Sequence, residues 1–330
     1  MKYEKIGPVE VIIGENKSRV PFSTSVVIKG DEHSTIIDCG AGYMAFKHIK
    51  KEHNVKDIYL THHHIDHMWG AHYFPEAKTY INHLDYKKIS SLEEIAKSEA
   101  ILALNKGVDW WNQDRKKLEQ LTDIRINRSL QVSDVYEYNK SIHMSGQDVM
   151  MIHAPGHTEG FCCPYIINQG ILFIGDIDLT SFGPYYSDRD SDIDSFIASA
   201  HQTLEVDASY FITSHQKGVV RKDEYKSQLL AYLDIIERRE EKIKQHIKSG
   251  NKPVDLVGLE VFYYSYQMEK SLSLMKSEKV GIAKHLQRLI KHGEPLEEYY
   301  EEYIKSHHLN KEYLSNKIAP TLTSSSKSFI

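Results

Sequence analysis

The sequence predicts a mixed α/β fold in which two sheets carry flanking helices, followed by a helical C-terminal extension. Three observations lead to this prediction. Short β-branched runs separated by turn residues fill much of residues 9–82. A second group of such runs occupies 135–215, and from about residue 223 the apolar residues recur at helical spacing. Strands and helices that follow one another in this way pack as layers around a shared core.

The first group of strands is marked by β-branched runs between turn residues such as GEN and KGDEH. The predicted strands are VEVII (9–13), SVVIK (25–29), TIIDC (35–39), DIYLT (57–61) and KTYIN (78–82). A short helix is expected over 43–52. The strand over 57–61 leads directly into a histidine-rich run, THHHIDHMWGAH.

Residues 85–130 differ from the strands around them and are predicted to be a helical insertion. Ser91 and Glu94 have the spacing of a capping box, and one continuous helix is expected over 91–105. Trp110 and Trp111 follow in a polar stretch that predicts them to be exposed. The insertion is either a lid whose tryptophans line a hydrophobic wall for the substrate, or a helix pair packed on the core.

The second group of strands is followed by helices to near the end of the chain. Its predicted strands are VYEYN (135–139), SIHM (141–144), DVMMIHA (148–154), PYIIN (164–168), ILFIGD (171–176) and ASYFITSH (208–215). A helix over 191–204 starts near Ser191 or Asp192. The extension, 223–318, carries one apolar stripe as far as Gly250 and further helices over 268–292 and 295–308, and the tail 319–330 is expected to be disordered.

Composition narrows the class of protein. The chain of 330 residues has 41 basic and 46 acidic side chains and no strongly basic region, so long nucleic acid is not an expected partner. The N-terminus lacks the pattern of a signal peptide, and no apolar run approaches the length of a membrane span. Cys39, Cys162 and Cys163 are too few and too badly spaced for a disulfide framework. These features predict a cytoplasmic protein with reduced thiols and no membrane partner.

Residues able to bind metals stand where four of the predicted strands end. HHHIDH follows the strand over 57–61, PGH157 follows that over 148–154, and Asp176 and His215 end two more. Loops at strand ends are where sites are commonly built. In an extended segment His62 and His64 lie on one side and His63 on the other. Imidazole with carboxylate suits Zn, Fe or Mn.

These motifs resemble the signature of the metallo-β-lactamase superfamily. His62-x-His64-x-Asp66-His67 matches its leading motif, and Asp38 in IIDCG, His157 in PGHT, Asp176 in GD and His215 in TSH follow the family's order over about residues 7–218. The resemblance implies an αββα sandwich that forms a catalytic domain over 1–222. It also implies a metallo-hydrolase.

The resemblance further implies two metal ions at one edge of the sandwich. His62, His64 and His157 would hold the first ion, and Asp66, His67 and His215 the second. Asp176 would bridge them, and Asp38 would orient the leading motif from behind the ligands. Two divalent ions are expected, zinc first, with iron or manganese as alternatives. They would share a bridging hydroxide, with Asp66 as the catalytic residue that orients it and passes a proton to the leaving group.

The expected substrate is a small molecule with an ester, thioester or lactone bond. A phosphodiester is the runner-up. Two different classes stay open: an iron-dependent redox member such as a persulfide dioxygenase-like protein, and a binding protein that keeps the metals but turns over poorly. Tyr185 and Tyr186 follow Asp176 and are candidates to contact the substrate, or else packing aromatics. His63 and His72 are predicted bystanders, and the extension is expected to cap the site or to form a homodimer surface.

Overall fold

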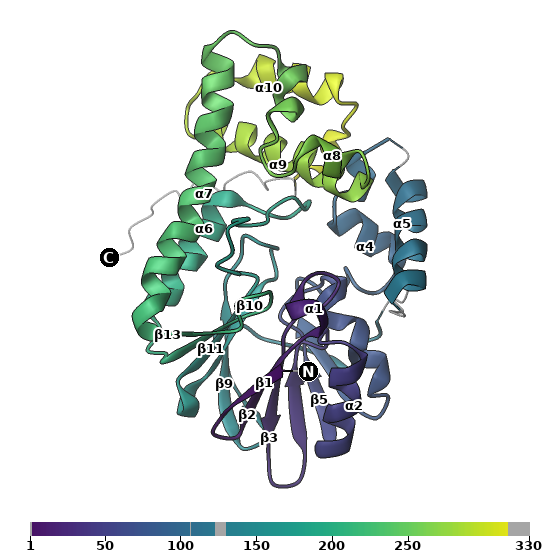
Figure 1. The fold of residues 1–330 in the computed structure, drawn as a ribbon, viewed down its shortest axis with the longest axis vertical. Coiled ribbons are helices and arrows are strands. Elements are labelled where there is room, and N and C mark those ends of the chain that lie inside the picture. Colours follow the sequence, from purple (N-terminus) through teal and green to yellow (C-terminus); the bar gives the residue numbers. More distant parts are fainter. Residues whose placement is uncertain (1, 106, 123–129, 316–330) are drawn as a thin grey trace, which may run out of the picture.

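The computed structural model describes residues 2–105, 107–122 and 130–315, which form two sheets stacked face to face with helices on both outer faces (Figure 1). This is the predicted αββα sandwich, and a helical region follows it. The tail 319–330 and its predicted disorder lie outside the described residues. Among the described helices, none is both long and apolar enough to cross a lipid bilayer.

The first sheet has seven strands in chain order, antiparallel from the first to the fourth and parallel from there on. Its strands are β1 (Lys2–Ile6), β2 (Val9–Ile13), β3 (Ser25–Lys29), β4 (Ser34–Ile37), β5 (Val55–Tyr59), β6 (Lys78–Asn82) and β7 (Asp134–Tyr136). β1 was not predicted, because its side chains are polar and mostly exposed at the edge of the sheet.

The second sheet has six strands, antiparallel except for one parallel pair, β11 with β12. Its order is β13 (Val219–Arg221), β12 (Tyr210–Thr213), β11 (Ile171–Gly175), β10 (Cys162–Ile166), β9 (Gln147–His153) and β8 (Ser141–Met144). β13 was not predicted either, because three residues are too few to form a recognisable pattern.

Successive side chains of a strand point to opposite faces of its sheet, and this places one set between the sheets and the other against the outer helices. In β2, Val9 and Val11 pack between the two sheets, whereas Ile12 faces the outer layer with helix α2 (Tyr43–Glu52). On the other side, α6 (Ile193–Gln202) and the first half of α7 (Lys222–Lys248) cover the second sheet. The central strands are therefore buried on both faces, which holds their ends rigidly.

Short helical segments lie in the loops at the strand ends or link the larger elements. They are α1 (Glu15–Ser18), α3 (Ile65–Met68), α8 (Ser265–Met268) and the 3-10 turns Trp69–Tyr73, Ile101–Ala103, Ile167–Gln169, Thr203–Glu205, Pro253–Leu259 and Lys311–Tyr313. The start of α6 lies at the second predicted position, since Asp192 accepts a hydrogen bond from the Ser195 amide at 2.7 Å.

The insertion is helical, but it is not the single helix predicted over 91–105. α4 (Leu92–Ser98) begins at Ser91, whose hydroxyl accepts from the Glu94 amide, and ends where Ala100 adopts a left-handed φ of 54°. α5 (Gly107–Thr122) follows. Trp110 and Trp111 are 8% and 6% exposed and pack in the layer outside the first sheet, so the prediction that they are exposed is wrong.

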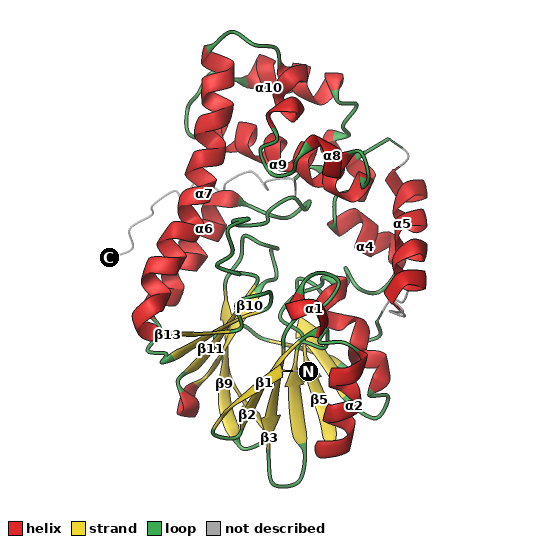
Figure 2. Cartoon of the chain, viewed as in Figure 1, coloured by secondary structure: helices red, strands yellow, loops and turns green. Residues whose placement is uncertain are grey.

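The C-terminal helices form an apolar cluster that is separate from the core of the sandwich. α7 runs from the sandwich to the far end of the molecule, where α9 (Leu272–Lys291) and α10 (Glu297–Ser306) pack on its second half (Figure 2). Ala100 and Ala103 of the insertion belong to this cluster as well. The insertion and the extension therefore pack together, and α7 shares its side chains between the sandwich and the extension.

Candidate metal centre

The fold brings all seven predicted metal ligands together at one edge of the sandwich. His62, His64, His157 and Asp176 form one group, and Asp66, His67 and His215 form another; within each group the candidate ligand atoms lie within 4.8 Å of one another. The residues come from the ends of β5, β9, β11 and β12. Strand ends that are distant in the sequence thus supply one compact set of imidazoles and carboxylates.

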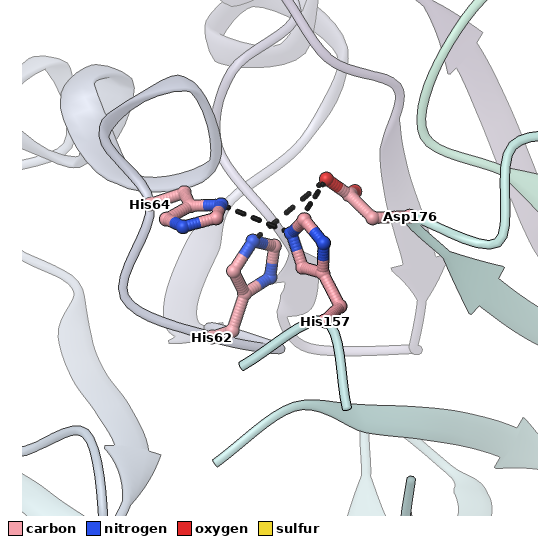
Figure 3. A group of neighbouring side chains, drawn as sticks. All are labelled: His62, His64, His157 and Asp176. Atoms are coloured by element: carbon pink, nitrogen blue, oxygen red, sulfur yellow. Dashed lines mark hydrogen bonds and ion pairs between the residues drawn. The ribbon is translucent and has the colours of Figure 1, made fainter. Parts of the chain in front are cut away.

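The first group is arranged around one carboxylate oxygen (Figure 3). His157 Nε2 lies 3.1 Å from Asp176 Oδ2 and 3.0 Å from His64 Nδ1. His62 Nε2 lies 3.9 Å from the same oxygen. The three imidazoles come from two loops and converge on Asp176.

The second group reaches the same aspartate. His67 Nε2 lies 3.1 Å from Asp176 Oδ1, and His215 Nε2 lies 3.6 Å from Asp176 Oδ2. Asp66 Oδ2 is 3.4 Å from His215 Nε2. Asp176 therefore contacts histidines of both groups, as a bridging carboxylate would.

Hydrogen bonds fix the direction of all five imidazoles. In each ring the nitrogen that points away from the centre has an acceptor nearby, which leaves the other nitrogen directed inward. These outward contacts are His62 Nδ1 with Thr61 Oγ1 (2.9 Å), His64 Nε2 with Asp188 Oδ2 (2.6 Å), His67 Nδ1 with Asp38 Oδ2 (2.6 Å), His157 Nδ1 with the Tyr185 carbonyl (3.0 Å) and His215 Nδ1 with the Ser18 carbonyl (2.6 Å).

The inward atoms fit divalent cations. Among the described residues, His62 Nε2, His67 Nε2 and Asp176 Oδ1 are buried and make no hydrogen bond, although His67 Nε2 and Asp176 Oδ1 lie 3.1 Å apart. A buried polar atom without a partner costs free energy, so three of them facing one another indicate a missing ligand. Imidazole nitrogens with carboxylate oxygens are the donor set that zinc and similar divalent ions take.

Asp38 lies where the sequence predicted it, behind the ligands. It is fully buried, and it also accepts from the Thr61 amide and hydroxyl, both at 2.8 Å. Its φ of 56° is left-handed, a conformation that surrounding contacts must enforce in a residue other than glycine. Gly40 follows closely, and a Cβ there would lie 1.6 Å from the Asp66 carbonyl oxygen. A glycine is therefore needed where this loop meets the histidine-rich run.

The charges of the centre influence one another strongly. Burial lowers the pKa of His67, His157 and His215, but nearby carboxylates, Asp176 among them, more than offset this and raise each pKa, that of His215 to about 10. The pKa of His62 is lowered, by burial first and then by neighbouring imidazoles. The metal-free centre therefore holds protons that a cation has to displace.

Two aspartates near the centre were not predicted. Asp178 Oδ1 accepts from the His215 amide at 3.1 Å, and burial raises the Asp178 pKa to about 7. Asp188 meets His64 Nε2 from the outer side of that ring. Asp178 follows Asp176 by two positions in GDID, which was an available signal. Asp188 stands in a polar loop whose sequence has no sign of which side chain turns inward.

The remaining candidates divide into neighbours and packing residues. The Tyr185 ring lies 5.9 Å from that of His157, whereas Tyr186 is fully buried and its hydroxyl lies 2.9 Å from His285 Nε2. His63 lies outside both ligand groups, with Nδ1 3.2 Å from Asp85. His72 lies outside them too, beside the Trp69 carbonyl. Of the two tyrosines, only Tyr185 borders the first group.

Comparison with known proteins agrees with this geometry. The profile of the metallo-beta-lactamase superfamily matches residues 19–215. A metallo-beta-lactamase family protein from Thermus thermophilus has a similar structure, with a TM-score of 0.61 at 15% identity over 87% of this chain and 94% of that chain. A beta-lactamase domain protein from Burkholderia ambifaria gives 0.58 at 14% identity over 89% of each chain. No curated protein matches this chain significantly.

Both structural likenesses extend beyond the segment that the family profile matches. Residues 1–222 make up about two thirds of the chain, so coverage of 87% and 89% includes part of the helical extension. At this level of identity the likeness concerns the fold. The profile match, which spans more than half of the chain, and the grouped histidines and aspartates agree, and the chain belongs to the metallo-beta-lactamase superfamily.

Proposed function

We propose that this protein is a dinuclear metal-dependent hydrolase that cleaves a small ester, thioester or lactone. Family membership and the buried His/Asp groups indicate a metal-dependent hydrolase. The observation that carries the finer proposal is the position of Asp176, whose two oxygens lie 3.1 Å from His157 Nε2 in one group and 3.1 Å from His67 Nε2 in the other. A carboxylate shared by two sets of imidazoles suits two ions better than one.

In this proposal the two groups of the metal centre each hold one ion. His62, His64 and His157 bind the first, Asp66, His67 and His215 bind the second, and Asp176 binds both. When bound, two such ions lower the pKa of a water molecule toward about 7 and polarise the carbonyl of the substrate. We propose zinc as the native metal, because the donors are nitrogen and oxygen and the sites are compact.

Asp66 is the proposed proton carrier. Its carboxylate is partly exposed and lies 3.4 Å from His215 Nε2, and its backbone carbonyl accepts from the Ser23 hydroxyl at 2.8 Å. The water oxygen attacks the substrate carbonyl carbon, and Asp66 takes the proton that the water loses. When the C–O or C–S bond breaks, Asp66 returns that proton to the leaving alcohol or thiol.

The cation nearest the first group favours a substrate without phosphate. Lys276 is nearly fully buried and lies 3.4 Å from Asp188, which contacts His64. Its ammonium group is thus already paired with a buried carboxylate. A phosphodiester substrate would gain little from it, which supports a neutral carbonyl substrate over the phosphodiester alternative.

Metal analysis and a substrate panel test the proposal. The chain, purified without added metal, is analysed for zinc, iron and manganese, and then assayed with p-nitrophenyl esters, thioesters, lactones and bis-p-nitrophenyl phosphate. About two zinc ions per chain and highest activity on a carbonyl substrate are expected. One metal per chain, iron with redox activity, or preference for the phosphodiester would contradict it.

Variants connect that activity to the site. Asp66→Ala and His157→Ala should abolish most of the activity, with losses of at least about 100-fold. His143→Ala is the matched control, because His143 is exposed and pairs with Asp148 at the surface. If the two site variants kept the activity of the parent chain, the assigned residues would be wrong.

A further inference from the structure

We infer that the C-terminal extension is a working part of the metal centre: its cations hold the loop 182–191, and through Asp188 this loop orients His64 at the first metal position. The inference rests on the proposed dinuclear function. It assigns a role to α7 and α9, and it means that the first metal position depends on the extension whereas the second does not.

The loop 182–191 contacts two histidines of the first group, His64 and His157. Asp188 Oδ2 lies 2.6 Å from His64 Nε2, and the Tyr185 carbonyl accepts from His157 Nδ1 at 3.0 Å. The Ser191 hydroxyl donates to the His157 carbonyl at 2.8 Å. The directions of two imidazoles in the first group are therefore set by one loop.

Helix α9 holds this loop from the other side. Lys276 Nζ donates to the Ser187 carbonyl at 3.2 Å and to the Tyr185 hydroxyl at 3.1 Å, and it lies 3.4 Å from Asp188 Oδ1. The Ser187 hydroxyl donates to the Ser277 carbonyl at 2.8 Å. Lys276 is thus placed to fix the side chain whose other oxygen meets His64.

Two further cations of the extension hold the ends of the loop. Lys284 lies two helical turns after Lys276, on the same face of α9, and donates to the Arg189 and Ser191 carbonyls at 2.9 and 2.8 Å. From α7, Arg239 donates to the Phe182 and Pro184 carbonyls at 2.5 and 2.6 Å. Buried cations are costly unless they are well paired, so three of them converging on one loop indicate a specific role rather than general stabilisation.

The second metal position is supported from elsewhere in the chain. His67 is oriented by Asp38, and His215 by the Ser18 carbonyl, both from the sandwich. A carboxylate that accepts from a ligand histidine fixes its tautomer and ring direction, and its loss commonly weakens metal binding 10- to 100-fold. Removing these contacts with the extension should therefore weaken metal binding at the first position but not at the second.

Cobalt(II) affinity, measured in the full-length chain by competition with a chelator, tests this selectivity. His67→Ala with His215→Ala leaves the first position, and His62→Ala with His157→Ala leaves the second. In the first background, Asp188→Asn and Lys276→Met should each lower cobalt affinity about 10- to 100-fold and alter the visible absorption of the bound ion. In the second background, affinity should stay within about threefold.

Asp188→Asn preserves the size and shape of the side chain, so it separates orientation of His64 from loss of packing. The control is Lys291→Met on the same helix, since Lys291 is exposed and pairs with Asp194 away from the loop. Equal weakening at both positions, or unchanged affinity at the first, would overturn the inference. A parent chain that binds fewer than two cobalt ions would instead overturn the proposed dinuclear function.

Discussion

Replacement of Asp38 by asparagine tests how the proposed second metal position is held. The carboxylate accepts three hydrogen bonds, from the Thr61 amide, the Thr61 hydroxyl and His67 Nδ1, at 2.8, 2.8 and 2.6 Å. Asparagine keeps the shape but has one acceptor oxygen and one amide group that only donates. In either orientation of the amide, a donor then faces a donor.

The size of the effect follows from these three contacts. A hydrogen bond to a charged acceptor contributes about 1.5–3 kcal/mol and a neutral one about 1 kcal/mol, so three weakened bonds should lower the free energy of unfolding by about 1.5–6 kcal/mol. If the amide donates to His67 Nδ1, the ring must carry its proton on Nε2, which faces the metal. Cobalt affinity at the second position should then fall about 10- to 100-fold.

Chemical denaturation of metal-free protein and cobalt competition measure the two effects. Asp207→Asn is the matched control, because that carboxylate is exposed and pairs with Lys222 at the surface. If Asp38→Asn changed the unfolding free energy by less than about 0.5 kcal/mol and left cobalt affinity within about threefold, the assigned role of Asp38 would be refuted.

Three other outcomes are expected. Metal affinity should rise with pH, by about tenfold per pH unit for each displaced proton. The reason is that nearby carboxylates outweigh the burial of His215 and raise its pKa to about 10. Equal metal affinities at pH 6 and pH 8 in a chelator competition would contradict this. Burial, with Asp188 nearby, raises the Glu99 pKa to about 7. The folded chain thus binds this proton more tightly than the unfolded chain, so the parent loses stability as pH rises from about 4.5 to 7. In urea unfolding at pH 8, Glu99→Gln should therefore be up to about 3 kcal/mol more stable than the parent. An equal gain in stability at pH 4 would show that the gain has another cause. Trp110→Ala should lower the unfolding free energy by about 3–5 kcal/mol while metal content stays constant; a variant with parent stability and lost metal would mean that the insertion acts at the centre instead.

Much of the fold could be predicted because the sandwich strands are buried and β-branched. Runs such as SVVIK have a strong local preference that their surroundings reinforce, and β3 begins and ends as predicted. The predictions failed where contacts with distant parts of the chain determine the local structure. Nothing local marks the break at Ala100, and Trp110 and Trp111 look exposed in a polar stretch yet pack in the layer outside the first sheet.

The candidate site divides in the same way. Spacing and strand ends predicted the residues that now surround Asp176, because ligands that share a loop keep a regular pattern. Asp188 and Lys276 carry no such pattern, since they meet only when α9 packs against the loop 182–191. In this protein the residues that support the centre are therefore harder to predict than its candidate ligands.

The origin of these supports along the chain has a consequence for biosynthesis. A ribosome makes Ser18 and Asp38 before the histidines that they orient, His215 and His67. Asp188 and Lys276 are made after His64, and α9 is made after every strand of the sandwich. In the proposed dinuclear centre, the residues that orient the second position are thus all made before the extension, whereas those that orient the first include Lys276 of the extension. Chains that end before α9 would then lack part of the support of the first position.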